Sequence, residues 1–426
     1  MNNLQRVQPP VFHIDAPVIP EVLTINLDNN IPVFLIESGT EDIMRIEFIF
    51  KAGQVKEYLP LQASTTNLML TEGSQKYSSI ELNRLFDYYG SFIHLSTEKD
   101  SAGLVVYLLN KHIEKILELS RELLFSSLFH QSELMALMKK RSRWFLVNRE
   151  KVQNLAMDQF FESVFGRTHP YGRMITEDDF ERITREVLID FHEKYYTPEN
   201  MTIIVSGKIH ERTTTLLNKF FGDIRSQKIY IEDAGNKLKG SRKKRVHVPR
   251  PGAVQSAIRI GSATINKRDP DYPGLKVLDS LLGGYFGSRL MKNIREEKGY
   301  TYGIGSYVTS FDLSGYKVIS TDVAINNTQK VKDEIYKEIE LLHSVPVKTE
   351  ELTVVKNFML GEMVRMFDGP FASAESFKSV WEFGLDNTYY QRLAEKIKSI
   401  NSDEIITLAN TYYKVEDLYE ITAGTL

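Results

Sequence analysis

The feature that most constrains the fold is an ungapped internal repeat. Residues 183–207 read ITREVLIDFHEKYYTPENMTIIVSG, and residues 400–424 read INSDEIITLANTYYKVEDLYEITAG. The offset is 217 at both ends (400 − 183 and 424 − 207), and it aligns a Tyr-Tyr pair and a closing glycine. Each copy has the pattern of a helix, a turn and a buried strand. Because the offset is about half of the 426 residues, the repeat predicts two similar domains in tandem.

Both halves of the chain mix short strand-like segments with longer helix-like ones. Residues 45–52 alternate as a strand does, and residues 111–125 carry an amphipathic helical stripe. We expect an α+β fold in which each domain is an antiparallel sheet packed with helices. The polar, basic run GNKLKGSRKKR predicts an inter-domain linker over residues 226–250. The predicted domains are therefore residues 1–225 and residues 251–426.

Composition argues against several classes of function. The formal net charge of −3 argues against a nucleic-acid or anionic-membrane partner. The chain has no cysteine, which excludes disulfides, Fe–S clusters, thiolate zinc sites and cysteine nucleophiles. The N-terminal segment has no apolar core of signal-peptide length, and no apolar run of the chain approaches the length of a transmembrane helix. We therefore expect a cytoplasmic protein.

Residues 281–307, LLGGYFGSRLMKNIREEKGYTYGIGSY, carry the strongest functional signal. A helix is predicted to start after Ser288, as its N-cap, and to stop at Gly299, before an aromatic strand. Arg295 would then lie in the last helical turn, and Tyr302 just beyond the stop. Both side chains donate hydrogen bonds, which suits a carbonyl oxygen or a developing oxyanion. On spacing alone, the simpler alternative is a surface arginine beside core aromatics.

Further ordered motifs accompany this stretch. They are HPYGR at residues 169–173, DPDY at residues 269–272 and the segment YYTPENMTIIVSG. Over nearly its whole length the chain resembles the insulinase/pitrilysin-type zinc peptidases, which include the mitochondrial processing peptidase and its two-chain bacterial relatives. The catalytic chain of that family carries an inverted zinc motif, His-x-x-Glu-His, on a helix. Two histidines at i and i+4 share one helical face and bind Zn²⁺, and the glutamate is the general base.

The sequence departs from the family at this zinc motif. Setting Gly73-Ser74 against the family's Gly-Thr places Ser64, Asn67 and Leu68 at the first His, the Glu and the second His. Leucine cannot bind zinc, and asparagine cannot act as a base near neutral pH. The family's later glutamate ligand would fall within residues 141–145, RSRWF, which contain no acid. The resemblance therefore implies a degenerate zinc site, with no cofactor in this chain. A metal site assembled from distant residues remains an alternative.

The other half of the family's active site is retained. In these peptidases an arginine and a tyrosine seven residues later bind the substrate carbonyl and stabilise the tetrahedral intermediate. Arg295 and Tyr302 match that pair (302 − 295 = 7). In two-chain members, one chain holds zinc and the other donates the Arg/Tyr pair. The resemblance implies a non-catalytic subunit of a heterodimeric zinc metallopeptidase, acting on a peptide substrate with a zinc-bearing paralogous subunit.

Two other hypotheses belong to different classes. The chain could be a peptide-binding or structural peptidase-like protein with no part in catalysis, or a self-sufficient hydrolase whose metal or nucleophile the sequence does not reveal. A homodimer of the isolated chain is also open. A further departure lies in residues 90–97, GSFIHLST, where His94-Leu95 replaces the Asn-Ala common in the family's substrate-pairing edge strand. We expect the larger Leu95 to narrow the substrate groove.

Overall fold

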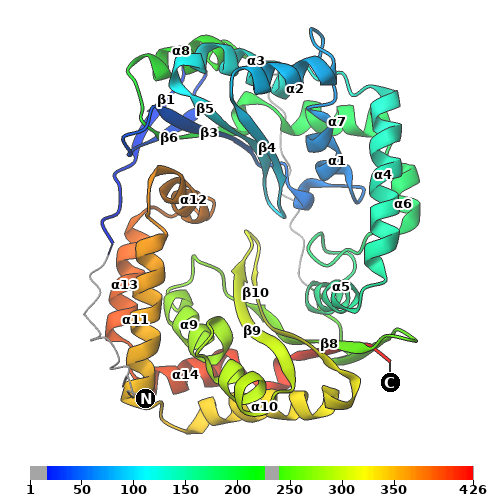
Figure 1. Cartoon of the computed structure of the whole chain (residues 1–426), viewed down its shortest axis with the longest axis vertical. Helices are drawn as coiled ribbons and strands as arrows, with labels where there is room; N and C mark the ends of the chain where they lie inside the picture. The colour runs from blue at the N-terminus through cyan, green and yellow to red at the C-terminus, as the bar shows by residue number, and fades with distance from the viewer. Residues whose placement is uncertain (1–16, 226–238, 426) are drawn as a thin grey trace, which may run out of the picture.

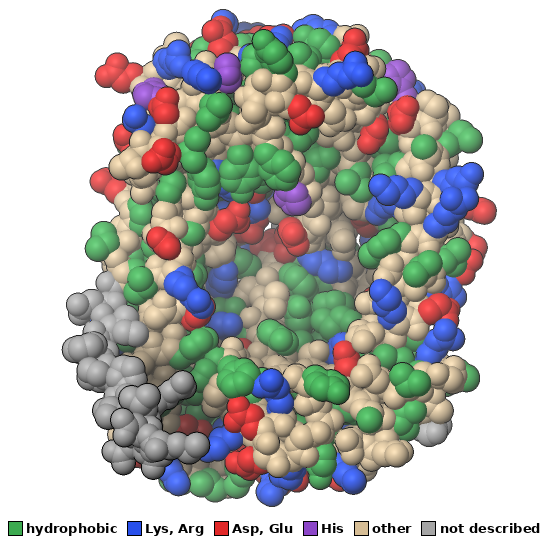
Figure 2. Space-filling view, viewed as in Figure 1, with side chains coloured by type: hydrophobic (Ala, Val, Ile, Leu, Met, Phe, Trp, Pro, Cys, Tyr) green, Lys and Arg blue, Asp and Glu red, His purple; other side chains and the backbone are tan. Residues whose placement is uncertain are grey.

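The computed structural model describes residues 17–225 and 239–425. The two halves of the chain form an upper and a lower lobe, each built on one β-sheet (Figure 1). The face between the lobes is hollowed, and acidic and basic side chains lie at the back of the hollow (Figure 2). The predicted α+β class with two similar, sheet-based domains is confirmed.

The first half forms the upper lobe. Its strands and helices are β1 (Leu23–Asn26), β2 (Pro32–Glu37), β3 (Ile43–Phe50), α1 (Gln62–Met69), α2 (Ser79–Tyr88), β4 (Phe92–Thr97), β5 (Ala102–Leu109), α3 (Ile113–Phe125), α4 (Gln131–Arg149), α5 (Val152–Phe165), α6 (Glu177–Arg182), α7 (Arg185–Tyr195), β6 (Met201–Gly207) and α8 (Arg212–Phe221). Short 3₁₀ turns are η1 (Gln54–Lys56), η2 (Asn110–His112) and η3 (Pro198–Asn200).

The second half forms the lower lobe. Its strands and helices are β7 (Arg245–Pro249), β8 (Gln255–Thr264), α9 (Tyr272–Asp279), β9 (Thr301–Ser310), β10 (Gly315–Ala324), α10 (Thr328–Ser344), α11 (Thr349–Arg365), α12 (Pro370–Trp381), α13 (Thr388–Ser399), α14 (Ser402–Tyr412) and β11 (Tyr419–Gly424). Two π-helical segments, η4 (Ser280–Gly284) and η5 (Met291–Glu297), lie between α9 and β9. The 3₁₀ turns are η6 (Ile325–Asn327) and η7 (Val415–Asp417).

The internal repeat corresponds to a repeated topology. Helices α7 and α14 are offset by 217 at both ends (402 − 185 and 412 − 195). The described strands of the first sheet run in the order β1-β2-β6-β3-β5-β4, and those of the second in the order β7-β11-β8-β10-β9. The strands that close the two copies, β6 and β11, end at glycines with positive φ, +121° at Gly207 and +155° at Gly424. A Cβ at Gly207 would lie 2.4 Å from the Ile43 oxygen, so close packing of the strands requires this glycine.

The sheets are mainly antiparallel, as expected, and each also contains one parallel pair. The parallel pairs are β2 with β6 and β7 with β11. In both pairs a long stretch of chain, with three further strands and several helices, separates the two strands. Such a crossover is the connection that lets a later strand run in the same direction as its neighbour.

The two lobes exchange one helix each. Helix α5, from the first half, packs on β8 and β11 of the second sheet, where Phe160 and Val164 share a core with Ala257 and Ile421. Helix α12, from the second half, packs on β6 and β2 of the first sheet, where Phe377 contacts a core that contains Ile204. Figure 1 shows α12 next to the first sheet and α5 next to β8. The apolar cores of the two halves are therefore interlocked.

The predicted boundaries, residues 1–225 and 251–426, remain a prediction. Within the predicted linker, residues 226–238 lie outside the described residues. Near its end, the predicted linker forms β7 (Arg245–Pro249), which pairs in parallel with β11. That end of the stretch is therefore part of the second sheet.

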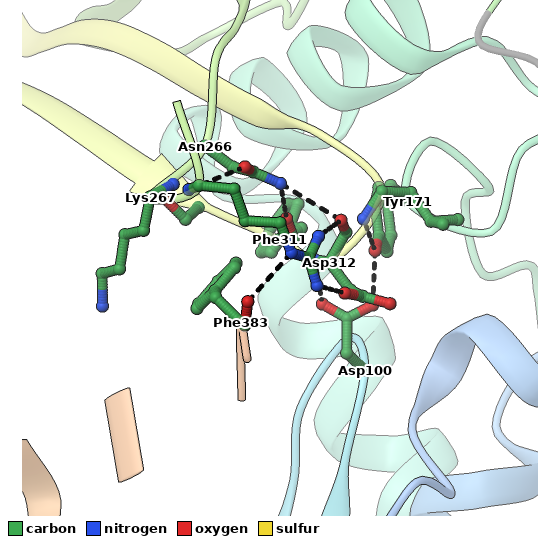
Figure 3. A network of polar contacts seen from close by, with 10 residues as sticks. Asp100, Tyr171, Asn266, Lys267, Phe311, Asp312 and Phe383 are labelled. Carbon is green, nitrogen blue, oxygen red and sulfur yellow. Dashed lines mark hydrogen bonds and ion pairs between the residues drawn. The ribbon is translucent and has the colours of Figure 1, made fainter. Parts of the chain in front are cut away.

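A polar junction joins the lobes where the β4–β5 turn meets the β9–β10 turn (Figure 3). The Tyr171 hydroxyl donates to Asp100, and the backbone N–H of Asp312 donates to the second Asp100 oxygen at 2.8 Å. Arg268 pairs with the Asp312 side chain and donates from Nε to the Phe383 oxygen at 3.0 Å. Burial raises the pKa of Asp100, while the hydrogen bond from Tyr171 opposes this shift. The junction holds the ends of edge strands β4 and β9 near each other.

Candidate functional site

The residues of the predicted degenerate zinc motif lie on α1. The guanidinium of Arg141 lies next to them. Arg141 of α4 donates to Ser64 Oγ at 2.8 Å and to Thr65 Oγ1 at 2.5 Å. The structure thus brings residue 141, at the start of the segment aligned with the family's later ligand, next to the first motif position. Burial lowers the pKa of Arg141, and the nearby Glu57 carboxyl opposes this effect. An arginine stays protonated in proteins, so a fixed positive charge lies beside the first position of the predicted zinc motif.

Asn67, at the position aligned with the family's general base, has a structural role. The Asn67 side chain is buried, and its Nδ2 donates to the Ser96 oxygen at 2.7 Å and to the Gly103 oxygen at 3.2 Å. Its Oδ1 accepts from the Tyr196 hydroxyl at 3.0 Å. These bonds tie α1 to strands β4 and β5. Because both ends of the amide are engaged by protein groups, Asn67 is a structural residue rather than a base for water.

The residues of this site do not fit Zn²⁺. Leu68, at the second histidine position, is an apolar side chain that is 37% exposed. The hydroxyl of Ser64 accepts from a cation, and Asn67 is held by backbone carbonyls and a tyrosine. Within residues 17–225 and 239–425, no group of three or more His, Asp or Glu side chains is placed to hold a metal ion. The expectation that this chain needs no metal remains a prediction.

Glu57 is a notable residue of this region that sequence reasoning missed. Its Oε1 accepts the backbone N–H of Ala63, at the start of α1, at 2.9 Å. Burial raises the pKa of Glu57 to about 7, while the backbone bond and the charges of Arg173, Lys99 and Arg141 oppose the rise. Glu57 lies just before α1 in the chain, but its charged partners come from distant segments. No local spacing could therefore have identified it.

The stretch predicted to carry the Arg/Tyr pair has the expected helix, stop and strand. Arg295 lies in η5, and Gly299 follows with a φ of +62°, the left-handed conformation typical just after a helix. The N–H of Tyr300 donates to the Ile294 oxygen at 3.0 Å, which holds the start of β9 against the last helical turn. Arg295 and Tyr302 therefore lie on adjoining elements. Within the described part of the chain they do not bond to each other.

The predicted cap at Ser288 is wrong. The Ser288 hydroxyl is buried, and it has no hydrogen-bond partner among the described residues. Only the backbone of Ser288 takes part in the helix start, because its carbonyl accepts the Lys292 N–H at 2.9 Å. The physical reason is that Ser288 follows a tight turn, with its own N–H bonded to the Tyr285 oxygen at 3.1 Å, and its side chain faces inward.

The two side chains of the pair differ in exposure, because Tyr302 is exposed and Arg295 is half-buried. Tyr302 is 94% exposed. The Arg295 guanidinium lies 4.7 Å from the centre of the Phe286 ring, and that ring is itself 62% exposed. Neither Tyr302 nor Phe286 is a core aromatic, so the alternative of a surface arginine beside core aromatics is wrong for these two rings. An exposed phenol and a guanidinium held on an aromatic face are free to bind an electron-rich group from another molecule.

The expected narrowing of the groove by Leu95 is also wrong. Leu95 and Ile93 pack against the hydrophobic core of the upper lobe. Phe92 and His94 of the same strand are exposed. Successive side chains of a strand point to opposite faces, so the His-Leu change places the imidazole, and not the leucine, on the outer face of β4.

Comparisons with known proteins agree with this architecture. A sequence profile described as "Peptidase M16 inactive domain" matches residues 182–359. The "Uncharacterized zinc protease YmxG" of Bacillus subtilis is 24% identical over 306 residues, covering 70% of this chain and 72% of the relative. The "Probable inactive metalloprotease YmfF" of the same organism is 21% identical over 399 residues, covering 87% and 89%. A crystal structure of a peptidase M16 inactive domain from Pseudomonas fluorescens superposes with a TM-score of 0.81 at 20% identity, covering 95% of this chain and 98% of that one.

The chain is similar to the insulinase (M16) peptidase family.

The similarity is to inactive-type M16 proteins, because the matched profile describes an inactive domain and one relative is described as probably inactive. At the predicted motif positions α1 has a serine, an asparagine and a leucine, with Arg141 nearby, and this set cannot bind zinc as a histidine pair does. No helix within the described ranges is long and apolar enough to cross a membrane. The cytoplasmic location of this protein remains a prediction.

Proposed function

We propose that this chain is the non-catalytic subunit of a heterodimeric zinc metallopeptidase. In this proposal Arg295 and Tyr302 bind the substrate carbonyl and stabilise the tetrahedral intermediate in the active site of a zinc-bearing partner. The observation that carries the proposal is the exposure of Tyr302, 94% on an edge strand next to the helix of Arg295. A phenol that is neither buried nor hydrogen-bonded within the described residues contributes little to the stability of its own chain.

The chemistry of the pair supports this role. As the carbonyl carbon becomes tetrahedral, negative charge develops on its oxygen, and donors already aimed at that oxygen lower the barrier. The Phe286 ring limits the freedom of the Arg295 guanidinium, so less ordering is needed when the substrate binds. The partner would supply the zinc and the general base.

The surroundings of α1 support a division of labour between two chains. A metal ion would meet the charge of Arg141 next to Ser64, and no base is available at Asn67. Catalysis by this chain alone would therefore need a different metal site or nucleophile. The retained Arg/Tyr pair distinguishes the proposal from a purely structural or peptide-binding role, which requires neither donor.

The first test is where the zinc lies. Two preparations are compared: the chain purified alone, and the complex that contains it, purified under native conditions from its own cells. The zinc content of each chain is measured in both. We expect a partner with an intact His-x-x-Glu-His motif, stoichiometric zinc in that partner only, and peptidase activity of the pair that a chelator removes. Stoichiometric zinc with peptide cleavage in the chain purified alone would overturn the proposal. A complex without a zinc-bearing chain would favour the structural alternative.

A further inference from the structure

Strand β9 contains a β-bulge at Tyr302. In the antiparallel pair of β9 and β10, Thr301 lies opposite Val323 and Ile304 lies opposite Thr321. Tyr302 and Gly303 therefore share a single partner, Asp322, so that two residues of β9 oppose one of β10. A bulge breaks the alternation of side chains and changes the direction in which one of them points. The bulge thus lies at the residue that the proposed function requires to face outward.

Two threonine hydroxyls hold the bulged backbone. Thr301 Oγ1 lies 2.8 Å from the Asp322 oxygen and 3.2 Å from the Gly303 nitrogen, and Thr321 Oγ1 lies 2.8 Å from the Gly303 oxygen. Each hydroxyl has one proton. These distances fit an arrangement in which Thr301 donates to Asp322 and accepts from Gly303, while Thr321 donates to Gly303. Both polar backbone groups of Gly303 are then bound by side chains.

The strand opposite the bulge is itself fixed. Arg259 of β8 is buried, and its Nη1 donates to the Thr321 oxygen at 3.1 Å. The same guanidinium pairs with the Asp322 carboxylate at 3.3 Å. The two β10 residues that contact the bulge are thus held from the far side by a charge in the interior. Such second contacts restrict the movement of the groups that they support.

The surroundings of the bulge leave room beside Tyr302. A Cβ at Gly303 would have no atom within 4 Å, so the packing of this chain does not require a glycine there. The Tyr307 ring, in contrast, covers Gly305, where its hydroxyl would lie 2.6 Å from an added Cβ. The open space at Gly303 lets a substrate backbone approach the strand next to the phenol.

We propose that Thr321 is a positioning residue, which holds the Tyr302–Gly303 bulge and thereby directs the Tyr302 phenol at the substrate carbonyl. This inference rests on the proposed function of the Arg/Tyr pair. It adds a residue on a different strand that acts through Tyr302 without contact with the substrate.

The test is a double-mutant cycle in the reconstituted pair, with an internally quenched peptide selected from a library using the wild-type pair. Thr321→Val keeps the shape of the side chain and removes the hydroxyl. We expect kcat to fall about tenfold with KM unchanged, since a displacement of 1 Å can cost up to about 100-fold. In the Tyr302→Phe background the same change should alter kcat by less than about twofold, because the phenol that it positions is already lost.

Thr264→Val is the matched control. Thr264 lies in β8 of the same sheet, and its hydroxyl has no hydrogen-bond partner among the described residues. This variant should keep the wild-type kcat. Thr321→Ser retains the hydroxyl and should restore most of the activity, even where Thr321→Val folds poorly. In the isolated chain, 3-fluorotyrosine at position 302 should give a shifted ¹⁹F resonance in Thr321→Val and an unchanged one in Thr264→Val.

The outcomes separate the two claims. If Tyr302→Phe leaves kcat unchanged, the proposed function fails. The positioning role of Thr321 fails if Tyr302→Phe lowers kcat but Thr321→Val does not. It also fails if Thr321→Val lowers kcat by the same factor with Tyr302 and with Phe at position 302. An unmoved ¹⁹F resonance in Thr321→Val, or a Thr321→Ser variant as slow as Thr321→Val, would also overturn it.

Discussion

Two half-buried charged residues determine the charge pattern around α1. Arg141 lies next to Ser64, and Glu57 bonds the first turn of the helix through Ala63. The sequence alignment located Arg141 because it begins the segment where the family has a ligand. It could not locate Glu57, whose raised pKa depends on burial among residues far apart in the chain. Local sequence patterns predict which residues occupy a motif, but they do not predict the desolvation that the folded structure imposes.

Glu57→Gln should change stability in a pH-dependent way. The pKa of Glu57 rises from 4.5 to about 7 in the folded chain, so folding favours the protonated carboxyl. Its contribution is present in full below pH 4.5 and is lost as the pH rises through about 7. Glutamine keeps an acceptor for the Ala63 N–H and never ionises. The variant should therefore match the wild type at pH 5 and be more stable at pH 8, by on the order of 2 kcal/mol.

Thermal unfolding at the two pH values provides the measurement. Glu81→Gln is the control, because Glu81 is an exposed acid in the capping box of α2 and its pKa is lowered by the Ser78 hydrogen bonds. It should show no gain in stability at pH 8. A gain for Glu57→Gln of equal size at pH 5 and pH 8 would contradict the assigned pKa.

At the scale of elements, the exchanged helix α12 is fixed by buried charge as well as by apolar packing. Lys378 donates to Glu47 Oε1 at 2.6 Å, and Arg45 donates to Glu47 Oε2 at 2.7 Å. Arg45 and Glu47 are each 1% exposed, and Arg45 also pairs with Glu375 of α12. Attraction to these carboxylates raises the pKa of both cations despite their burial. A helix of the second half is thereby bound to β3 of the first.

Glu47→Gln should destabilise the protein strongly. The change removes the negative charge that faces Arg45 and Lys378. Breaking a buried ion pair costs about 3–5 kcal/mol of folding stability. Calorimetry should show a large fall in Tm. Asp223→Asn breaks the Arg121–Asp223 pair, whose side chains are 35% and 65% exposed. That control should cost less than about 1 kcal/mol. Equal falls for the two variants would show that the charge network does not hold α12.

Elements differ in how well the sequence predicts them. The 217-residue offset predicted α7 and α14, because both copies repeat the same local pattern of apolar residues. The helix, glycine and strand around Arg295 were also predicted from local signals. The exchange of α5 and α12 was not, because an apolar helical stripe does not specify which sheet it will cover. The bulge at Tyr302 was missed because it depends on the register of β9 with β10.

The whole molecule presents two edge strands on its hollowed face. β4 is one edge of the first sheet and β9 is one edge of the second, and the Asp100–Asp312 junction joins the turns that follow them (Figures 1 and 3). In the upper lobe, the region of the family's zinc site is closed by Arg141 and Asn67. In the lower lobe, the Tyr302 phenol is exposed, and the half-buried Arg295 guanidinium lies on the exposed Phe286 ring. The two lobes share a topology but differ in the chemistry that they retain.

The turnover of a Tyr302→Phe variant in the zinc-bearing pair tests the central claim most directly. Tyr88→Phe, on α2, is the matched control, since that side chain is 79% exposed and lies in the other half of the chain. We expect Tyr302→Phe to assemble normally and to lower kcat by about 10²–10³, the usual cost of losing one oxyanion donor, while Tyr88→Phe keeps full activity. A Tyr302→Phe pair with wild-type kcat would contradict the account.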